Sequence, residues 1–363
     1  MSISGTGIVF GGREIAAAVA QAMTRASGTP DERAPRRHLI EAPSPVQRMR
    51  RLEQEIGASV ELYVKREDAL RPLYGNKLRY IEYVLGALDL VGADCLLHCG
   101  GPTSNYLGQL AMIGAETGLA VYLVVTADEP ETVTGNPLIM QTMGARLRWQ
   151  AGCSCSAMKA AWAAELVAAG RRAMLIDAPF TNHSAILGYM RAWREIASQV
   201  RSGALPQPDH IVLCSAGNSY LGLRIAADMA GAEEWKITAF SSIRFADAGL
   251  AGIAASREAF LLGKAEAFAS WCGERQHTFK VDVDESAVGP GYPVPSAESI
   301  AAVRLVGRTE GILLDPIYTG KAMAGLLDGV RKDRYPRGSR ILFMHSGGWA
   351  NAFTFNTALS AAA

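Results

Sequence analysis

Long apolar segments are missing from this sequence: no run of about 18 apolar residues occurs, so no membrane-spanning helix is expected. The opening residues, MSISGTGIVFGGREI, have no basic segment ahead of an apolar one, so a secretory signal is not expected either. Net charge is also nearly absent, because 36 Lys and Arg oppose 35 Asp and Glu. A surface so balanced provides no basic field for nucleic acid. We therefore expect a cytoplasmic protein that binds neither nucleic acid nor membranes.

Cysteine is sparse, at six residues in a chain of 363. Cys95, Cys99 and Cys214 lie in or beside apolar runs, which is typical of small buried hydrophobic side chains. Cys153 and Cys155 form a C-x-C pair, but no other metal ligands stand near them in the sequence. We therefore predict no metal site. Reduced thiols are the default in a cytosolic protein.

What the sequence does contain points to an α/β enzyme. Hydrophobic residues make up 49% of the chain, which is enough for a core, and the length suggests two domains of about 150 residues or more. Many of the 37 glycines stand next to apolar runs, as tight strand-to-helix turns require. Strand-like and helix-like apolar patterns alternate, which predicts parallel sheets with ligands at the carboxyl ends of strands.

The predicted elements follow this alternation. Strands are predicted at 61–68, 94–101, 119–126, 146–150, 172–178, 210–218, 236–242 and 340–348. Helices are predicted at 76–92, 103–118, 137–145, 157–170, 184–200, 219–231, 249–273, 296–311 and 319–332. A short helix is also predicted at 13–26, and the charged segment 27–37 is expected to be a linker or surface arm.

Four strand-to-helix junctions have compositions suited to binding a ligand: YGNKLR (74–79), GGPTSNY (100–106), CSAGNSYLGL (214–223) and HSGG (345–348). In the first, Lys77 stands at a helix start, where the macrodipole favours anions over cations. Cationic surroundings and partial burial would lower its pKa, as a Schiff-base lysine requires. The alternative is a solvated lysine on the first turn of a helix.

The second and third junctions suit anions. Thr103, Ser104 and Asn105 open a helix whose backbone N–H groups would hold a carboxylate, and simple N-capping is the alternative. Residues 215–219 are small and would let backbone N–H groups wrap a phosphate, with a plain turn as the alternative. This segment matches neither G-x-G-x-x-G nor a P-loop, so dinucleotide binding is not indicated.

Together and in this order, these segments resemble the fold-type-II pyridoxal-phosphate enzymes. The resemblance includes KRED (65–68) before GNKLR (75–79), and LLDPIYTGKAMAGL (313–326) before ILFMHSGG (341–348). The most similar branch is the D-cysteine desulfhydrase and 1-aminocyclopropane-1-carboxylate (ACC) deaminase family, over residues 40–355.

The resemblance implies an α/β fold like that of the tryptophan synthase β-subunit, with two open, twisted, mostly parallel sheets flanked by helices. The cofactor, pyridoxal 5′-phosphate, would lie in the interdomain cleft. Residues 40–79 and 187–363 would form the large cofactor-binding domain, residues 80–186 the small domain and residues 1–39 an N-terminal extension. The resemblance also implies a homodimer and a small amino-acid substrate.

The resemblance assigns roles to individual residues. Lys77 would form the aldimine with the cofactor and move protons. Asn105 would lie beside the cofactor ring, and Ser104 near the substrate carboxylate as a candidate acid or base. The phosphate loop would consist of Ser215, Ala216, Gly217, Asn218 and Ser219. The substrate would contact Thr103, Ser104, Asn105, Tyr106, Tyr292 and Tyr318.

Residues near the end of the chain carry the expected chemistry. Tyr292 and Tyr318 would act as catalytic residues facing the substrate, with packing as their alternative role. Thr319 would lie opposite the pyridine nitrogen of the cofactor, and it also suits the N-cap of helix 319–332. ACC deaminases carry a glutamate there, which strengthens the electron sink that ring opening needs. His345 is expected to be structural or near the rim of the cofactor site.

A neutral threonine at position 319 favours α,β-elimination on a small amino acid with a cysteine-like or cysteate-like leaving group, giving pyruvate and ammonia. The alternatives are β-replacement, ACC-type ring opening, and a non-catalytic binding protein of the same fold. The chain departs from the family pattern at three positions. It has Tyr74 and Asn218 where the family has Gly, and Tyr106 where the family has His or Gln. These departures leave the cofactor in place and concern the substrate.

Overall fold

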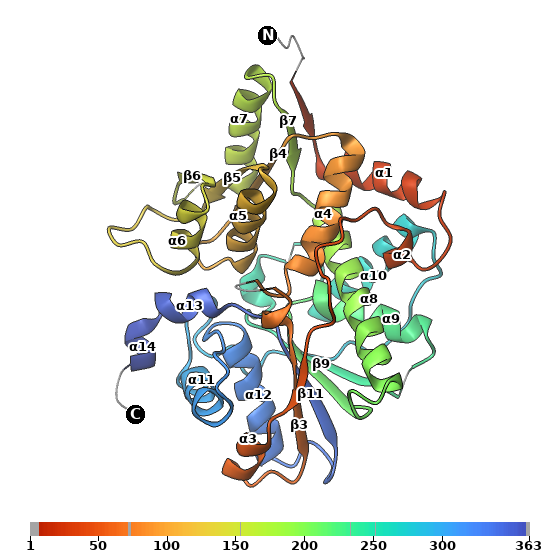
Figure 1. Ribbon diagram of the computed structural model, residues 1–363, viewed down its shortest axis with the longest axis vertical. Coiled ribbons are helices and arrows are strands. Elements are labelled where there is room, and N and C mark those ends of the chain that lie inside the picture. The colour runs from red at the N-terminus through yellow and green to blue at the C-terminus, as the bar shows by residue number, and fades with distance from the viewer. Residues whose placement is uncertain (1–6, 72–73, 153, 233, 251, 361–363) are drawn as a thin grey trace. The chain divides into compact units, whose positions relative to one another are not determined.

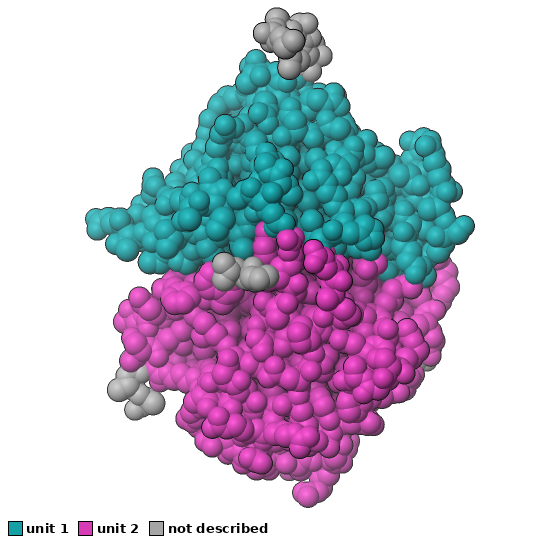
Figure 2. Space-filling view, in the orientation of Figure 1, with its two compact units in different colours: residues 1–39, 80–184 teal, residues 40–79, 185–363 magenta. Residues whose placement is uncertain are grey.

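The computed structural model describes residues 7–71, 74–152, 154–232, 234–250 and 252–360. The chain divides into two compact units, which Figure 2 colours separately: residues 1–39 with 80–184 form unit 1, and residues 40–79 with 185–363 form unit 2. One boundary lies between Leu39 and Ile40, and the other two fall inside helices α4 (Leu78–Val91) and α8 (Phe180–Arg201). Within the described ranges, no helix combines the length and apolar character that a bilayer crossing requires.

Unit 1 is built on a five-stranded parallel sheet with the strand order β1-β7-β4-β5-β6 (Figure 1). Its strands are β1 (Ile8–Phe10), β4 (Cys95–Gly100), β5 (Ala120–Val125), β6 (Arg146–Trp149) and β7 (Arg172–Leu175). Its helices include α1 (Gly12–Met23), α2 (Pro30–Arg33), α5 (Asn105–Thr117), α6 (Gly135–Thr142) and α7 (Cys155–Ala168). The central strand β4 is a nearly continuous apolar run, because α5 and α7 both pack on it.

The N-terminal segment is an integral part of unit 1. β1 pairs with β7, and α1 packs through an apolar face. Residues 27–37, which we expected to be a linker or surface arm, are anchored instead. Asp31 is fully buried, its carbonyl accepts a hydrogen bond from the Tyr83 hydroxyl at 2.7 Å, and Arg36 pairs with Glu82 at 2.9 Å. The segment is therefore tied to α4 both through its backbone and through the charge of Arg36.

Unit 2 contains a six-stranded sheet with the order β10-β9-β8-β11-β3-β2, in which β2 runs antiparallel to β3 and the other pairs are parallel. Its strands are β2 (Val46–Arg48), β3 (Glu61–Arg66), β8 (His210–Cys214), β9 (Lys236–Phe240), β10 (Val283–Asp284) and β11 (Arg340–His345). Gly325 allows helix α12 (Thr319–Arg331) to lie directly on the sheet, because a Cβ at this position would overlap the Phe240 ring.

The remaining elements of unit 2 are helical. They are α3 (Arg50–Glu55), η1 (Glu67–Ala69), α9 (Asn218–Met229), η2 (Ala246–Ala248), α10 (Arg257–Cys272), α11 (Ala297–Glu310), α12 (Thr319–Arg331), α13 (Trp349–Thr354) and α14 (Asn356–Ser360). The helix predicted at 249–273 is shorter than expected. α10 begins at Arg257 because the Ser256 hydroxyl accepts the N–H of Ala259 and so caps the helix.

A buried network of four charged side chains holds the segment that leads into α4. Arg79 donates two hydrogen bonds to Glu67 and one to Glu195, the latter at 3.0 Å. Lys65 donates to Glu195 at 2.6 Å, so two positive and two negative charges balance inside unit 2. Burial opposes ionisation of Glu195, yet Arg79 and Lys65 lower the pKa of this carboxyl group to about 2. The network therefore fixes Arg79, two residues past Lys77, against η1 and α8.

We expect Arg79→Met to lower the free energy of unfolding by about 3–5 kcal/mol, because it leaves two buried carboxylates without their guanidinium partner. Urea denaturation followed by circular dichroism measures the loss. Arg308→Met is the matched control in unit 2, since the ion pair between Arg308 and Glu55 is exposed (64% and 48%) and is worth less than about 1 kcal/mol. Equal losses in the two variants would contradict the stabilising role of the buried network.

Candidate active site

The segment that carries Lys77 is held against the HSGG segment at the carboxyl end of β11. The backbone N–H of Asn76, a buried residue, donates to a carbonyl of that segment at 3.1 Å. Gly347 has a φ of 88°, and a Cβ there would come within 3.0 Å of the Gly75 Cα. The first and fourth junctions singled out in the sequence therefore meet in unit 2, and only glycine allows this approach.

Lys77 stands between this contact and the first residue of α4. Burial lowers the pKa of its amine to about 8, although the nearby Cys214 and Asp315 favour the charged form. About half of the amine is therefore unprotonated near pH 8, where it can act as a nucleophile or base. This setting differs from that of a solvated lysine on a helix surface.

Asp315 organises the turn that leads into α12. Its carboxylate accepts hydrogen bonds from the backbone N–H groups of Ile317 and Tyr318, the former at 2.9 Å, and from the side-chain amide of Asn351 at 2.5 Å. The residue is fully buried, and burial raises the pKa of its carboxyl group to about 7 despite these donors. The carboxylate thus shapes the backbone on which Tyr318 and Thr319 stand.

Thr319 is the first residue of α12 rather than its N-cap, which is Tyr318. The Thr319 hydroxyl accepts the backbone N–H of Asp315 at 2.7 Å, and it lies 3.3 Å from the Asp315 carbonyl, to which it donates. The N-cap assignment made from the sequence is therefore wrong. The residue is completely buried and presents a neutral hydroxyl at the position where the sequence pattern places the partner of the pyridine nitrogen.

Tyr292 and Tyr318 share a hydrogen bond between their hydroxyl groups, at 2.7 Å. Burial raises the pKa of Tyr318 well above its ordinary value, so its hydroxyl stays protonated at neutral pH. Lys321 anchors the loop of Tyr292. This residue is fully buried, and its ammonium group donates to the Gly291 carbonyl at 2.9 Å. The two tyrosines therefore form a connected pair of hydroxyl groups and do not serve as packing residues alone.

The small-residue turn lies between β8 and α9. The Ser215 hydroxyl accepts the N–H groups of Gly217 and Tyr220, at 3.1 and 3.3 Å, and so fixes the shape of the turn. A Cβ at Gly217 would come within 2.8 Å of the Leu261 Cδ2, so a larger residue there would require the Leu261 side chain to shift. Asn218 and Ser219 open α9, where backbone N–H groups and the helix dipole favour an anion.

The second junction belongs to unit 1. Ser104 is the N-cap of α5, and its hydroxyl accepts the N–H of Leu107 at 3.4 Å. Asn105 is oriented by Asn136, whose amide donates to the Asn105 Oδ1 at 2.8 Å and to the carbonyl of the buried Thr103 at 3.4 Å. Capping and a role in binding are therefore compatible, since the cap uses only one face of the Ser104 hydroxyl.

Two ring side chains that the sequence placed near the site pack within their own units. The Tyr106 ring meets His98 edge-on at 5.1 Å and Tyr80 at 6.3 Å between ring centroids, and burial raises the pKa of Tyr106. His345 is fully buried, its Nδ1 accepts the Gly347 N–H at 3.4 Å, and burial lowers its pKa. His345 thus braces the end of β11.

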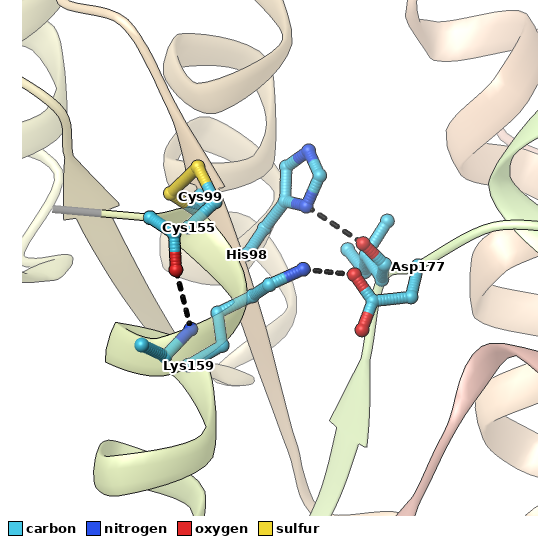
Figure 3. Close-up of a disulfide and its surroundings, with 8 residues drawn as sticks. His98, Cys99, Cys155, Lys159 and Asp177 are labelled. Atoms are coloured by element: carbon cyan, nitrogen blue, oxygen red, sulfur yellow. Dashed lines mark hydrogen bonds and ion pairs between the residues drawn. A yellow bond between two sulfur atoms is a disulfide. The ribbon is translucent and has the colours of Figure 1, made fainter. Parts of the chain in front are cut away.

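A disulfide joins Cys99, at the end of β4, to Cys155, at the start of α7 (Figure 3). Beside it, Lys159 forms an ion pair with Asp177, and the His98 ring is hydrogen-bonded to the carbonyl of Ile176. The expectation that Cys99 is a simple buried thiol is therefore wrong. The local C-x-C pattern relates Cys155 to Cys153, which lies outside the described residues, and gives no sign of a partner 56 positions away.

Three functional candidates were missed by the sequence reasoning: Asp315, Asn351 and Asn136. Asp315 stands in the L-D-P-I-Y segment, and an Asp before Pro is a known turn signal that pointed to its backbone-binding role. Asn136 and Asn351 act through partners 31 and 36 residues away, so no local pattern marks them.

The residues present fit pyridoxal phosphate. Lys77 offers an amine of lowered pKa to an aldehyde, and the turn at 215–219 is built of small residues whose shape the Ser215 hydroxyl fixes. The start of α9 supplies N–H groups suited to a phosphate. These features lie together at the carboxyl ends of parallel strands in unit 2, as expected for a ligand site in an α/β fold.

Comparison with known proteins gives a consistent result. The family model described as "Pyridoxal-phosphate dependent enzyme" matches residues 38–347. An ACC deaminase of Methylobacterium sp. (strain 4-46) is 32% identical over 322 residues, 85% of this chain and 93% of the relative. A D-cysteine desulfhydrase of Klebsiella pneumoniae (strain 342) is 32% identical over 337 residues, 89% of this chain and 97% of the relative. The crystal structure of an ACC deaminase homologue has a TM-score of 0.76 at 28% identity, covering 94% of this chain and 98% of the other.

We expect acylation of Lys77 by an amine-directed reagent to accelerate as the pH rises through about 8, because only the neutral amine reacts and burial lowers its pKa to that value. Mass spectrometry of Lys77 over a series from neutral to alkaline pH gives the midpoint. The exposed Lys280, quantified in the same digest, serves as the reference for reagent decay. A midpoint near the ordinary lysine value of about 10.4 would contradict the effect of burial.

Proposed function

Because the chain belongs to the pyridoxal-phosphate-dependent enzymes, in the branch of the ACC deaminases and D-cysteine desulfhydrases, we propose that it catalyses α,β-elimination on a small amino acid. It is a lyase, and its substrate carries a cysteine-like or cysteate-like group at Cβ. Cα loses a proton, the bond from Cβ to the leaving group breaks, and the leaving group departs with the bonding electrons. Water then completes the conversion to pyruvate and ammonia.

The observation that carries the choice of elimination is the neutral, buried hydroxyl of Thr319. When bound, the cofactor supplies an electron sink for the charge that develops at Cα, and a hydroxyl instead of a carboxylate beside it suits loss of a good leaving group rather than ring opening. The nearby carboxylate of Asp315 is already engaged by two backbone N–H groups and by Asn351. It supports the turn and leaves Thr319 as the neutral partner.

Lys77 is the residue that we assign to proton transfer at Cα, because its lowered pKa keeps much of the amine neutral near pH 8. Tyr318 remains protonated, so the pair that it forms with Tyr292 acts as a hydrogen-bond donor toward the substrate. In unit 1, Ser104 and Asn105 at the start of α5 suit the substrate carboxylate, and Ser104 is the alternative base.

Ring opening of ACC is the second candidate function. It is favoured by the 32% identity to an ACC deaminase over 85% of the chain. The two reactions have different products, since elimination from a three-carbon amino acid gives pyruvate and opening of the cyclopropane ring gives 2-oxobutyrate. Product identity therefore separates them.

We expect the cofactor-loaded enzyme to release pyruvate and ammonia from one enantiomer of cysteine, β-chloroalanine or cysteate, and no 2-oxobutyrate from ACC. Lys77→Ala should lower kcat by at least about 10³-fold, because it removes both the cofactor-binding amine and the Cα base. Coupled assays for the two oxo acids measure both outcomes. Release of 2-oxobutyrate from ACC without any pyruvate from the panel would reject elimination in favour of the second candidate.

We expect Tyr318→Phe to lower kcat by about 10²-fold, in the range of a lost acid or hydrogen-bond donor, with a smaller effect on KM. Tyr335→Phe is the matched control, because Tyr335 is also a buried tyrosine of unit 2 and its hydroxyl has no hydrogen-bond partner among the described residues. Its kcat should stay near that of the wild type. An equal loss in both variants would show that packing rather than the Tyr318 hydroxyl matters.

A further inference from the structure

One face of α10 lines the turn at residues 215–219. Arg257, Leu261 and Lys264 stand at i, i+4 and i+7, so their side chains lie on the same side of the helix. In order, they contact residues 216, 217 and 218 of the turn. Arg257 and Lys264 have different roles at this turn.

Arg257 fixes the backbone of the turn. Its guanidinium donates to the carbonyl of Ala216 at 2.9 Å and to the carbonyl of Ile243 at 2.8 Å. Its Nε forms an ion pair with Glu285 at 2.5 Å. The charge of Arg257 is therefore balanced by a carboxylate, and the residue orders the backbone of the turn.

Lys264 reaches the open end of the same turn. Its ammonium group donates to the Asn218 Oδ1 at 2.9 Å and lies 4.7 Å from the centre of the Phe260 ring. Asn218 is the first residue of α9, where the helix N–H groups and the positive end of the dipole favour an anion. The family pattern has glycine at this position, so the side chain that receives Lys264 is one of the departures of this chain.

We propose that Lys264 binds the phosphate of the cofactor together with the backbone of residues 217–219. This inference rests on the proposed function, since it assumes pyridoxal phosphate as the cofactor. The ammonium group is held 2.9 Å from the side chain of Asn218, the first residue of α9. It therefore lies next to the helix N-terminus that favours an anion. A hydrogen bond between two ionised groups is about twice as strong as one between neutral groups, so the lysine adds to what the backbone supplies.

The desolvation of Lys264 supports this assignment. Burial lowers the pKa of its amine to about 8, which means that the protein surroundings disfavour the charge. A phosphate placed beside the amine would reverse this effect, because an opposite charge favours the protonated form. The side-chain amide of Asn218 is neutral and compensates the charge of Lys264 less than a phosphate would.

The test compares pyridoxal phosphate with pyridoxal, which has the same aldehyde but no phosphate. The apoenzyme is titrated with each compound, and the dissociation constant is read from the absorbance or fluorescence of the bound ligand. For Lys264→Met we expect the dissociation constant of pyridoxal phosphate to rise about 10- to 100-fold, while that of pyridoxal changes less than about threefold. Lys264→Arg should recover most of the affinity, and Lys332→Met, at a lysine that is 71% exposed, should bind both like the wild type.

An equal loss for the two ligands in Lys264→Met would mean that the lysine only braces Asn218, and no loss for either would also overturn the inference. A second measurement needs no variant: inorganic phosphate should slow acylation of Lys264 in the wild-type apoenzyme, and an unchanged rate would count against the assignment. If the wild type binds pyridoxal phosphate through Lys77 and the variants bind it equally well, the Lys264 inference alone fails. If the wild type binds neither compound, the proposed function fails with it.

Discussion

The ionic network of Arg79, Glu67, Glu195 and Lys65 is the constraint on which the rest of unit 2 depends. Moving each charge out of water costs several kcal/mol, and only multiple well-placed hydrogen bonds offset that cost. The network meets this condition by drawing on β3, α4 and α8 at once, and Ser44 adds a hydrogen bond to Glu67 at 2.8 Å. Segments far apart in the sequence are thereby joined at one point, two residues from the candidate Schiff-base lysine.

Burial acts in opposite directions on the two ionisable groups of the site interior. It lowers the pKa of Lys77 to about 8 and raises that of Asp315 to about 7. Both pKa values therefore lie close to neutral pH, which favours proton transfer under physiological conditions. The Asp315 carboxylate accepts hydrogen bonds from the backbone of the next turn and from Asn351, so its role is architectural.

The fold class could be predicted from the sequence because the apolar periodicity and the glycine-bounded strand ends are local signals. Lys77, Tyr292 and Tyr318 stand in segments distinctive enough to mark them as candidates, and their roles in the site stay predictions. The pairing of Cys99 with Cys155 could not, because it joins residues 56 positions apart that no local pattern relates. Nor could the burial of Asp31, since a charged, proline-containing segment is usually solvated, and here its partners lie on α4. The N-cap role of Thr319 failed for a related reason: the hydroxyl serves the backbone four residues earlier instead of the helix that follows.

The disulfide between β4 and α7 closes a covalent loop within unit 1. Residues 128–132, between β5 and α6, are exposed and lie inside the loop that the two cysteines close. A peptide bond broken in this stretch would leave two polypeptides that remain one molecule for as long as the sulfur–sulfur bond persists. The β4 strand, which leads directly into the GGPTSN segment, would then stay tethered to α7 in a nicked chain. Limited proteolysis of this protein therefore gives different fragment patterns on gels run with and without reductant.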